Sequence, residues 1–195
     1  LTYRNKKDMQ FKGGNEFRYF NTKSKDYASE NIATIDFLRN NFHFRLTPDK
    51  DRSFDGYKSQ QEINGRYRID KERAEDPDTE ADYVYVYFTL KDETPELEGG
   101  VYLTGAFNNW KTDKSVKMNY NMEQKAYEKR LLLKQGYYNY RYVLKNYQGF
   151  DPYFYSGNYY QTENEYQVYI YYNDFSDGYD RLIGHTVYNS ASVQY

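Results

Sequence analysis

One tryptophan beside two amides is the first group in this sequence that could bind a ligand. Trp110, the only tryptophan, ends the stretch VYLTGAFNNW (residues 101–110) and follows Asn108 and Asn109. An indole face can stack on the C–H face of a sugar ring while neighbouring amides bond its hydroxyl groups. The same residues also suit the corner of a β-sandwich, where asparagines form the turn. Residue types alone favour the corner, with sugar binding as the alternative.

A second candidate surface lies in the stretch SGNYYQTENEY, residues 156–166. It combines a glycine, paired tyrosines and a polar run, and exposed aromatic loops often mark binding surfaces. The alternative is a hairpin connection whose tyrosines pack on the edge of the sandwich, and the residue types do not decide between the two. The candidate residues for contact with a partner are Tyr159, Tyr160, Gln161 and Glu163.

Alternating carboxylates in the stretch KERAEDPDTEAD, residues 71–82, could supply oxygen ligands to calcium. The residues concerned are Asp76, Asp78, Glu80 and Asp82. The stretch lacks the glycine and the distal glutamate of an EF-hand loop. A flexible acidic linker is therefore the favoured interpretation.

Groups that could carry out catalysis show no recognisable arrangement. The two histidines, His43 and His185, lie far apart in the sequence. His43 alternates with Phe42 and Phe44, so we expect its side chain on the opposite face, toward solvent. The sequence contains no cysteine, no Gly-x-Ser-x-Gly elbow, no His-Glu-x-x-His pair and no Walker loop. We therefore predict a non-enzymatic protein without a metal or cofactor.

The composition restricts the classes of partner. Charged residues make up 29% of the 195 residues and nearly cancel, which leaves a net charge of −2. This balance argues against nucleic-acid binding, which usually needs a basic excess. No apolar run approaches the roughly 20 residues of a membrane span, so direct membrane insertion is not expected. The 27 tyrosines favour strands and must supply much of the core.

Period-two alternation predicts the strands that must position these residues. In residues 83–90, Val84, Val86, Phe88 and Leu90 share one face. Turn residues separate such segments, and no long helical pattern occurs, so we predict an all-β sandwich fold. A polar loop is expected at 48–62. The other predicted strands cover residues 16–21, 31–38, 41–46, 64–69, 101–104, 136–144 and 165–172.

The acidic stretch also suggests a boundary between modules. We predict two β-sandwich modules, with residues 71–82 as an acidic linker between them. Residues 1–70 are expected to be the C-terminal part of a truncated N-terminal module. Residues 83–195 are expected to form a second, immunoglobulin-like sandwich.

Two stretches of the second module resemble a known family. GGVYLTGAFNNWK (99–111) and AYEKRLLLKQGYYNYRYVLKN (126–146) are similar to the glycogen-binding modules beside amylase-type enzymes and in the AMP-activated kinase β subunit. Those modules are early-set immunoglobulin-like sandwiches whose turn tryptophan stacks on glucan, so the resemblance implies this role for Trp110. Phe150 stands where the family has a second tryptophan, and Asn164 is the nearest match to its asparagine. The α-glucan site implied by the resemblance comprises Asn108, Asn109, Trp110, Phe150 and Asn164.

A second resemblance covers nearly the whole chain. GNEFRYFNTKS (14–24), the run from 63 to 90, GYYNYRYVL (136–144), YYQTENEYQVYIYY (159–172) and GYDRLIG (178–184) look like the type IX secretion system plug protein family of Bacteroidota. Members of that family are exported. The resemblance implies a periplasmic, outer-membrane-associated protein that closes the periplasmic side of the outer-membrane translocon barrel. The sequence thus predicts a protein partner, with α-glucan as the alternative ligand.

Overall fold

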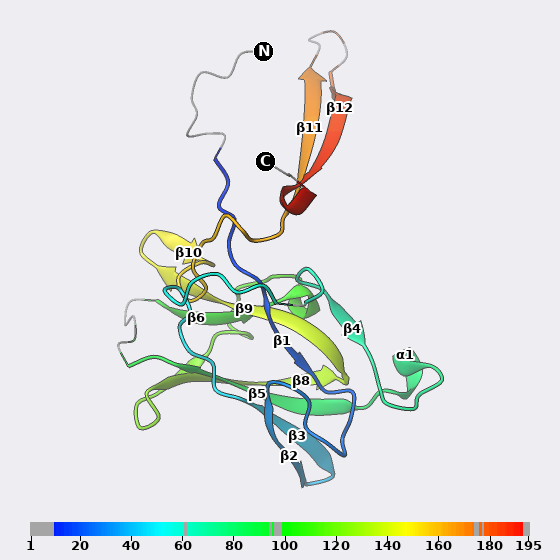
Figure 1. The fold of residues 1–195 in the computed structure, drawn as a ribbon, viewed down its shortest axis with the longest axis vertical. Helices are drawn as coiled ribbons and strands as arrows, with labels where there is room; N and C mark the ends of the chain where they lie inside the picture. The colour runs from blue at the N-terminus through cyan, green and yellow to red at the C-terminus, as the bar shows by residue number, and fades with distance from the viewer. Residues whose placement is uncertain are drawn as a thin grey trace.

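Two stacked β-sheets and a projecting two-stranded hairpin make up the fold (Figure 1). The structure is a computed structural model that describes residues 10–60, 62–93, 95, 99–173, 176 and 178–192. Nearly all of its regular structure is strand, so the all-β prediction is confirmed. No helix among these residues is both long enough and apolar enough to span a membrane.

The first sheet is built around one long strand, β9 (Gly136–Asn146). All four of its other strands pair with β9 in antiparallel register. They are β1 (Arg18–Asn21), β4 (Tyr67–Ile69), β6 (Gly100–Thr104) and β10 (Gly149–Asp151).

The second sheet has the order β2-β3-β5-β8-β7. β3 and β5 pair in parallel, and the remaining neighbours pair in antiparallel register. The strands are β2 (Ile32–Leu38), β3 (Asn41–Leu46), β5 (Tyr83–Lys91), β7 (Asn119–Asn121) and β8 (Ala126–Lys134).

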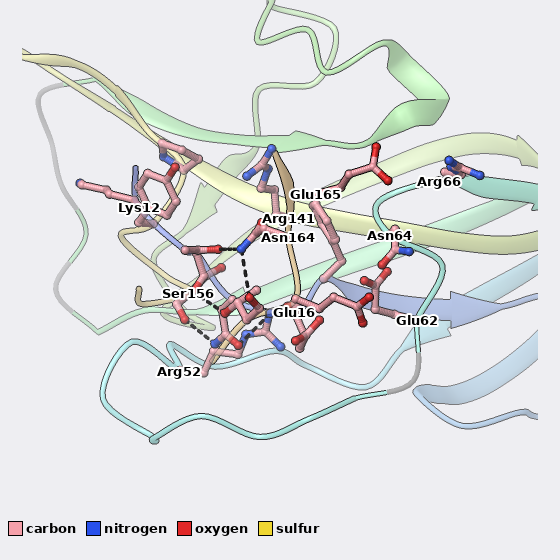
Figure 2. A pocket seen from close by; sticks show the side chains of 18 of the residues that line it. Lys12, Glu16, Arg52, Glu62, Asn64, Arg66, Arg141, Ser156, Asn164 and Glu165 are labelled. Carbon is pink, nitrogen blue, oxygen red and sulfur yellow. Dashed lines mark hydrogen bonds between the residues drawn. The ribbon is translucent and has the colours of Figure 1, made fainter. Parts of the chain in front are cut away.

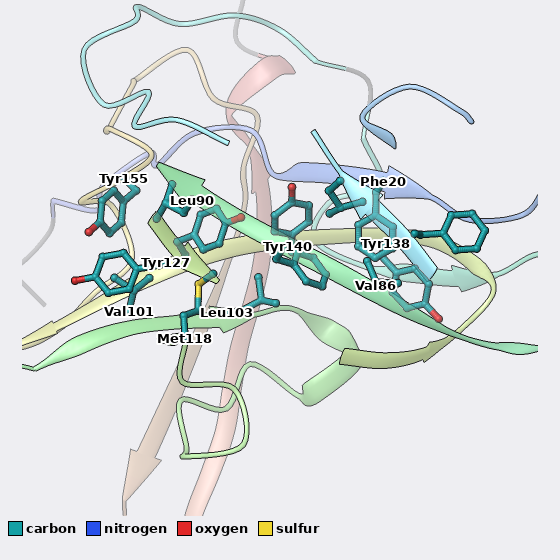
Figure 3. Close-up of a cluster of buried hydrophobic side chains, with 14 of the residues drawn as sticks. Phe20, Val86, Leu90, Val101, Leu103, Met118, Tyr127, Tyr138, Tyr140 and Tyr155 are labelled. Carbon is teal, nitrogen blue, oxygen red and sulfur yellow. The ribbon is translucent and has the colours of Figure 1, made fainter. Parts of the chain in front are cut away.

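A tyrosine-rich core fills the space between the two sheets (Figure 3). The alternating faces predicted for residues 83–90 and 136–144 are both buried there. β5 and β9 contribute Val84, Val86, Phe88, Leu90, Tyr138, Tyr140, Tyr142 and Leu144. Tyrosine serves this purpose because its ring buries a large area while its hydroxyl reaches a polar partner.

The expected division into a 1–70 module and an 83–195 module differs from the structure. β1 pairs with β9, and β3 pairs with β5, so strands from both parts share both sheets. Phe20 is fully buried and stacks on Tyr138 with ring centroids 5.1 Å apart. One sandwich with a common core therefore replaces the two modules, because alternation shows which residues face a core but not which strands pair across it.

The acidic residues 71–82, expected as a linker between modules, form the connection from β4 in one sheet to β5 in the other. They contain one short helix, α1 (Pro77–Glu80), whose N-cap is Asp76. Asp76 Oδ1 accepts a hydrogen bond from the Asp78 backbone N–H at 3.2 Å. The Asp82 carboxylate pairs with Lys25 at 2.8 Å. The alternating carboxylates thus cap a helix and form an ion pair, and the described residues contain no cluster suited to a metal ion.

His43 was expected to face solvent, and this was wrong. Its side chain lies on the outer face of the second sheet, but the residue is only 9% exposed. The parallel register of β3 and β5 sets Tyr85 beside it, with ring centroids 5.0 Å apart. The imidazole Nδ1 lies 2.8 Å from the Tyr87 hydroxyl. Neighbouring tyrosines cover this histidine, which alternation within one strand could not reveal.

The hairpin of β11 (Glu165–Asn173) and β12 (Asp180–Asn189) projects from the sandwich (Figure 1). Neither strand pairs with a strand of the two large sheets. The Ser190 backbone N–H donates to the Asn164 carbonyl at 2.9 Å and closes the base, where the 3₁₀ turn Ser190–Ser192 follows. Alternation predicted β11 correctly, but no layer of the described chain covers either of its faces.

Candidate functional site

The corner after β6 is a 3₁₀ turn, Ala106–Asn108, that holds Trp110 in place. Gly105 starts it, and a Cβ there would lie 2.4 Å from the Phe107 ring and 2.7 Å from the Asn139 carbonyl. Only glycine therefore fits this position. Asn109 and Trp110 both adopt left-handed backbone conformations, with φ of 54° and 59°.

Asn108 uses its side chain to build this corner. Its Oδ1 accepts from the Gly105 N–H at 3.1 Å, and its Nδ2 donates to the Lys111 carbonyl at 3.1 Å. A further contact joins Nδ2 to the Leu103 carbonyl at 3.4 Å. These bonds occupy the amide within the turn, which is the role that residue types favoured over sugar binding.

Trp110 is 36% exposed and packs against residues from three other parts of the chain. Its ring centroid lies 5.4 Å from that of Phe17, and the Arg141 guanidinium carbon lies 4.7 Å from its ring. A Cβ on Gly65 would lie 3.0 Å from Cζ2 of the indole. The indole thus presents only part of its surface to a ligand.

Phe150 lies on the same outer face of the first sheet as Trp110. Arg141 and Lys145 point outward from β9, because the alternate residues of this strand fill the core. Arg141 contacts Trp110, and the Lys145 Nζ lies 5.5 Å from the Phe150 ring. The two cations are four residues apart, or about 13 Å along a strand. Phe150 is half exposed and packs edge-on against Tyr102.

Asn164 fastens the base of the hairpin to the N-terminal segment. Its Nδ2 donates to the Gly13 carbonyl at 2.8 Å and to the Thr162 carbonyl at 3.2 Å. Asn164 lines the same cavity as Phe17 and Arg141, which contact Trp110. Its amide therefore holds the fold together at the edge of the cavity.

The four residues expected to meet a partner are not equally exposed, because Tyr159 is half-buried. The Tyr159 hydroxyl donates to the Ser53 carbonyl at 2.9 Å, so this side chain docks inward. Tyr160 is 88% exposed, and Gln161 is exposed beside it. Glu163 lines the cavity and accepts a hydrogen bond from Asn189 at 3.1 Å. Tyr160, Gln161 and Glu163 are therefore exposed as expected, whereas the Tyr159 hydroxyl bonds within the fold.

The cavity, of about 420 Å³, lies between the N-terminal segment, β9 and the base of the hairpin (Figure 2). Residues distant in sequence meet there, and sequence reasoning did not predict the site. Its basic side chains are Lys12, Arg52, Arg66 and Arg141, and its acidic side chains are Glu16, Glu62, Glu163 and Glu165. The only feature of the sequence that pointed to this site was Arg141, which alternates with the core tyrosines of β9 and therefore faces outward.

Burial shifts the titration of several cavity residues. It lowers the pKa of Arg141 and, together with the nearby charge of Arg18, lowers the pKa of Arg52 to about 10. Burial raises the pKa of Glu62, and the charge of Glu16 adds to this effect. The cavity therefore holds ionisable groups that are partly removed from water.

The hairpin presents an extensive apolar surface. Nine of its large side chains are between 44% and 60% exposed. They are Val168, Tyr169, Ile170, Tyr171, Tyr172, Leu182, Ile183, Val187 and Tyr188. Within residues 166–172 and 181–188 the only formal charge is that of Arg181. We call these two sides of β11 and β12 the hairpin faces.

Comparison with known proteins gives a likeness of structure. No family model matches the chain, and a search of curated proteins finds no match. Among solved structures, a hypothetical protein from Parabacteroides merdae is 41% identical and superimposes with a TM-score of 0.83. The match covers 90% of this chain and 45% of the other, so the chain spans less than half the length of that relative. The all-β sandwich is therefore shared with a protein of the Bacteroidota.

Proposed function

We propose that this chain belongs to an exported, non-enzymatic protein that binds a protein partner through the hairpin faces. We further propose that the partner is the outer-membrane translocon barrel of type IX secretion. In this role the protein occludes the periplasmic side of the barrel. The observation that carries the proposal is the projecting hairpin, whose two faces are both apolar and uncovered.

The area of the hairpin faces suits a protein interface. Nine half-exposed side chains present on the order of 800 Å², since a large aromatic side chain buries roughly 150–250 Å². A standard interface takes about 800 Å² from each partner. An isolated two-stranded hairpin is marginally stable in water, so contact on its faces would also stabilise it. Tyrosine is enriched at such interfaces.

The unpaired edges of the hairpin favour a protein over a lipid surface. β11 and β12 pair only with each other, so each has one edge of backbone N–H and C=O groups without a strand partner in the described chain. Hydrocarbon cannot satisfy those groups, whereas a protein partner can. This agrees with a soluble plug that docks on a barrel.

The choice of partner rests on the resemblance to the plug family. Two of the stretches that carry it, YYQTENEYQVYIYY and GYDRLIG, contain most of the two hairpin strands. The family has two clearest sequence marks, the run from 76 to 90 and the ending from QTENEY to YDRLIG, and the second coincides with the apolar hairpin faces. That coincidence supports a role of the hairpin in contacting the translocon.

A matched pair of leucines tests the proposal. Leu182 on the hairpin and Leu132 on β8 are 50% and 51% exposed. Tagged protein with the native sequence should recover the translocon barrel from outer membranes of the native organism. Leu182→Lys should lose that recovery, and Leu132→Lys should keep it. Failure of the native sequence to recover the barrel, or equal recovery by both variants, would overturn the proposal.

α-Glucan binding is the second candidate function. It is favoured by Trp110 and Phe150 lying on one outer face of the first sheet, beside Arg141 and Lys145. Calorimetry with millimolar maltoheptaose should then show binding that Trp110→Ala abolishes. An absence of heat with the native sequence would eliminate this candidate and leave the protein-partner proposal untouched.

A further inference from the structure

Arg141 lines the cavity without an acidic partner among the residues that the structure describes. Its guanidinium instead lies over two rings, 4.7 Å from that of Trp110 and 5.2 Å from that of Phe17. Burial lowers its pKa, and the only charge effect that opposes this comes from Tyr153. A partly buried cation without an anion is unfavourable, so this position suits a negative group supplied from outside.

A second arginine of the cavity also has unused hydrogen-bonding capacity. Arg52 donates one bond to the Glu16 carbonyl. Its buried Nε has no hydrogen-bond partner within the described chain. The cavity is thus lined by two arginines, one without an acidic partner and one with an unpaired Nε.

The four glutamates restrict which anion can enter. Glu16 accepts from the Tyr57 hydroxyl at 2.6 Å, and Glu62 accepts from the Gly65 N–H at 3.2 Å. Their negative charges would repel a phosphate or sulfate dianion, and they repel a single carboxylate less. Carboxylate oxygens also have several acceptor sites each, which suits a ligand with hydroxyl groups.

Other residues that line the cavity add a further hydrogen-bonding group and apolar surface. Asn64 offers an amide, and the rings of Phe17 and Tyr153 offer apolar surface. The volume of about 420 Å³ lies within the range of small-molecule sites, roughly 300–1,000 Å³. A ligand that fits all these groups carries one carboxylate, several hydroxyls and an apolar C–H face.

We propose that this cavity binds a carboxylated sugar of the uronic acid class. Arg141 receives the carboxylate, Glu62 and Asn64 bond hydroxyl groups, and Phe17 contacts the C–H face of the ring. The site lies apart from the hairpin faces and goes beyond the proposed protein partner. Its acidic ligand also distinguishes it from the neutral α-glucan of the alternative function.

The single tryptophan provides a direct readout of this site. Trp110 contacts Arg141, so a carboxylate that binds the guanidinium should change its emission. The probes are glucuronate, glucose and acetate, since glucuronate and glucose differ only at C6. Glucuronate should give a saturable change at millimolar concentration and bind at least about tenfold more tightly than the other two, as expected for a charge-assisted bond.

Variants of two arginines make the test specific. Arg141→Gln should weaken glucuronate binding by roughly tenfold or more, and Arg141→Lys should restore part of it. Arg130→Gln is the matched control, because Arg130 lies over the Tyr85 ring on the outer face of the other sheet, away from the cavity. It should bind like the native sequence.

Three results would overturn this proposal. They are no saturable response to glucuronate, equal binding of glucose or acetate, and unchanged binding in folded Arg141→Gln. A negative result here leaves recovery of the translocon unaffected, so failure of this site and failure of the proposed function are distinguishable.

Discussion

Arg18 and Asp49 form an ion pair inside the sandwich, with 2.8 Å between Nη1 and Oδ1. The other oxygen of Asp49 accepts from the hydroxyls of Tyr140 and Tyr142, both at 2.7 Å. Arg18 also donates to the carbonyl of Lys50 at 2.7 Å. One carboxylate thus links β1, β9 and the segment after β3, and fixes the strands that carry the cavity.

Loss of this carboxylate should destabilise the fold. Asp49→Ala leaves the Arg18 guanidinium buried without its anion and removes the acceptor of two tyrosine hydroxyls. Breaking a buried pair in this way typically costs about 3–5 kcal/mol. Urea unfolding should show a loss of this size, whereas Asp55→Ala, at an exposed position, should change stability by less than about 0.5 kcal/mol. Equal stability of the two variants would refute the structural role of Asp49.

The hairpin and the sandwich should respond differently to the same substitution. Leu103 is fully buried between the sheets, and Leu182 is 50% exposed on the hairpin. Leu103→Ala should reduce the free energy of unfolding by about 2–5 kcal/mol, because it removes packing and leaves a cavity. Leu182→Ala should change it by less than about 0.5 kcal/mol. A large effect of Leu182→Ala would mean that the hairpin is packed against the sandwich in solution.

The corner at Trp110 depends on one glycine. Gly105→Ala would place a Cβ against the Phe107 ring and the Asn139 carbonyl, so the turn must move. We expect a loss of roughly 1–3 kcal/mol, similar to other overpacked sites, and a shift of the Trp110 emission. Gly184→Ala is the control, because its nearest atom would be a side-chain carbon of Ile170 at 3.4 Å. Gly105→Ala with native stability and native emission would contradict this account.

The sequence predicted the strands well because their alternation is a local property. Val84 and Tyr140 were placed correctly on buried faces, since the residues two positions away are also apolar. It did not predict that Phe20 packs on Tyr138, because strand pairing depends on contacts more than a hundred residues apart. The acidic stretch 71–82 looked like a module boundary for the same reason: its composition does not show where the strands on either side pair.

The candidate sites were harder to predict than the strands. Asp49 was expected in the polar loop at 48–62, and nothing in its neighbours shows that its carboxylate reaches Arg18. Trp110 was identified correctly as a corner residue, but its contacts with Phe17 and Arg141 join three separate segments. β11 was predicted as a strand of the second sandwich, and its exposure arises because no layer of the described chain covers it. Each of these features depends on tertiary packing.

Stability should fall at alkaline pH because buried tyrosines resist ionisation. Burial raises the pKa of Tyr140 and Tyr142, and the charge of Asp49 adds to this effect. Burial also raises the pKa of Tyr137 to about 12. In the unfolded chain tyrosine ionises near pH 10, so above that pH the unfolded state loses protons that the folded state keeps. The stabilisation is therefore complete below about pH 10 and is lost as pH rises toward the folded-state pKa values.

Tyr142→Phe tests this explanation with urea unfolding over a pH series. Each buried tyrosine that stays protonated should contribute a slope of about −1.4 kcal/mol per pH unit above about pH 10. The variant should therefore be less stable near neutral pH, where its hydrogen bond to Asp49 is missing, and should lose stability less steeply in alkali. Tyr147→Phe, at a highly exposed position, should keep the native profile. If the alkaline slope is the same in Tyr142→Phe as in the native sequence, ionisation of this tyrosine does not limit stability at high pH.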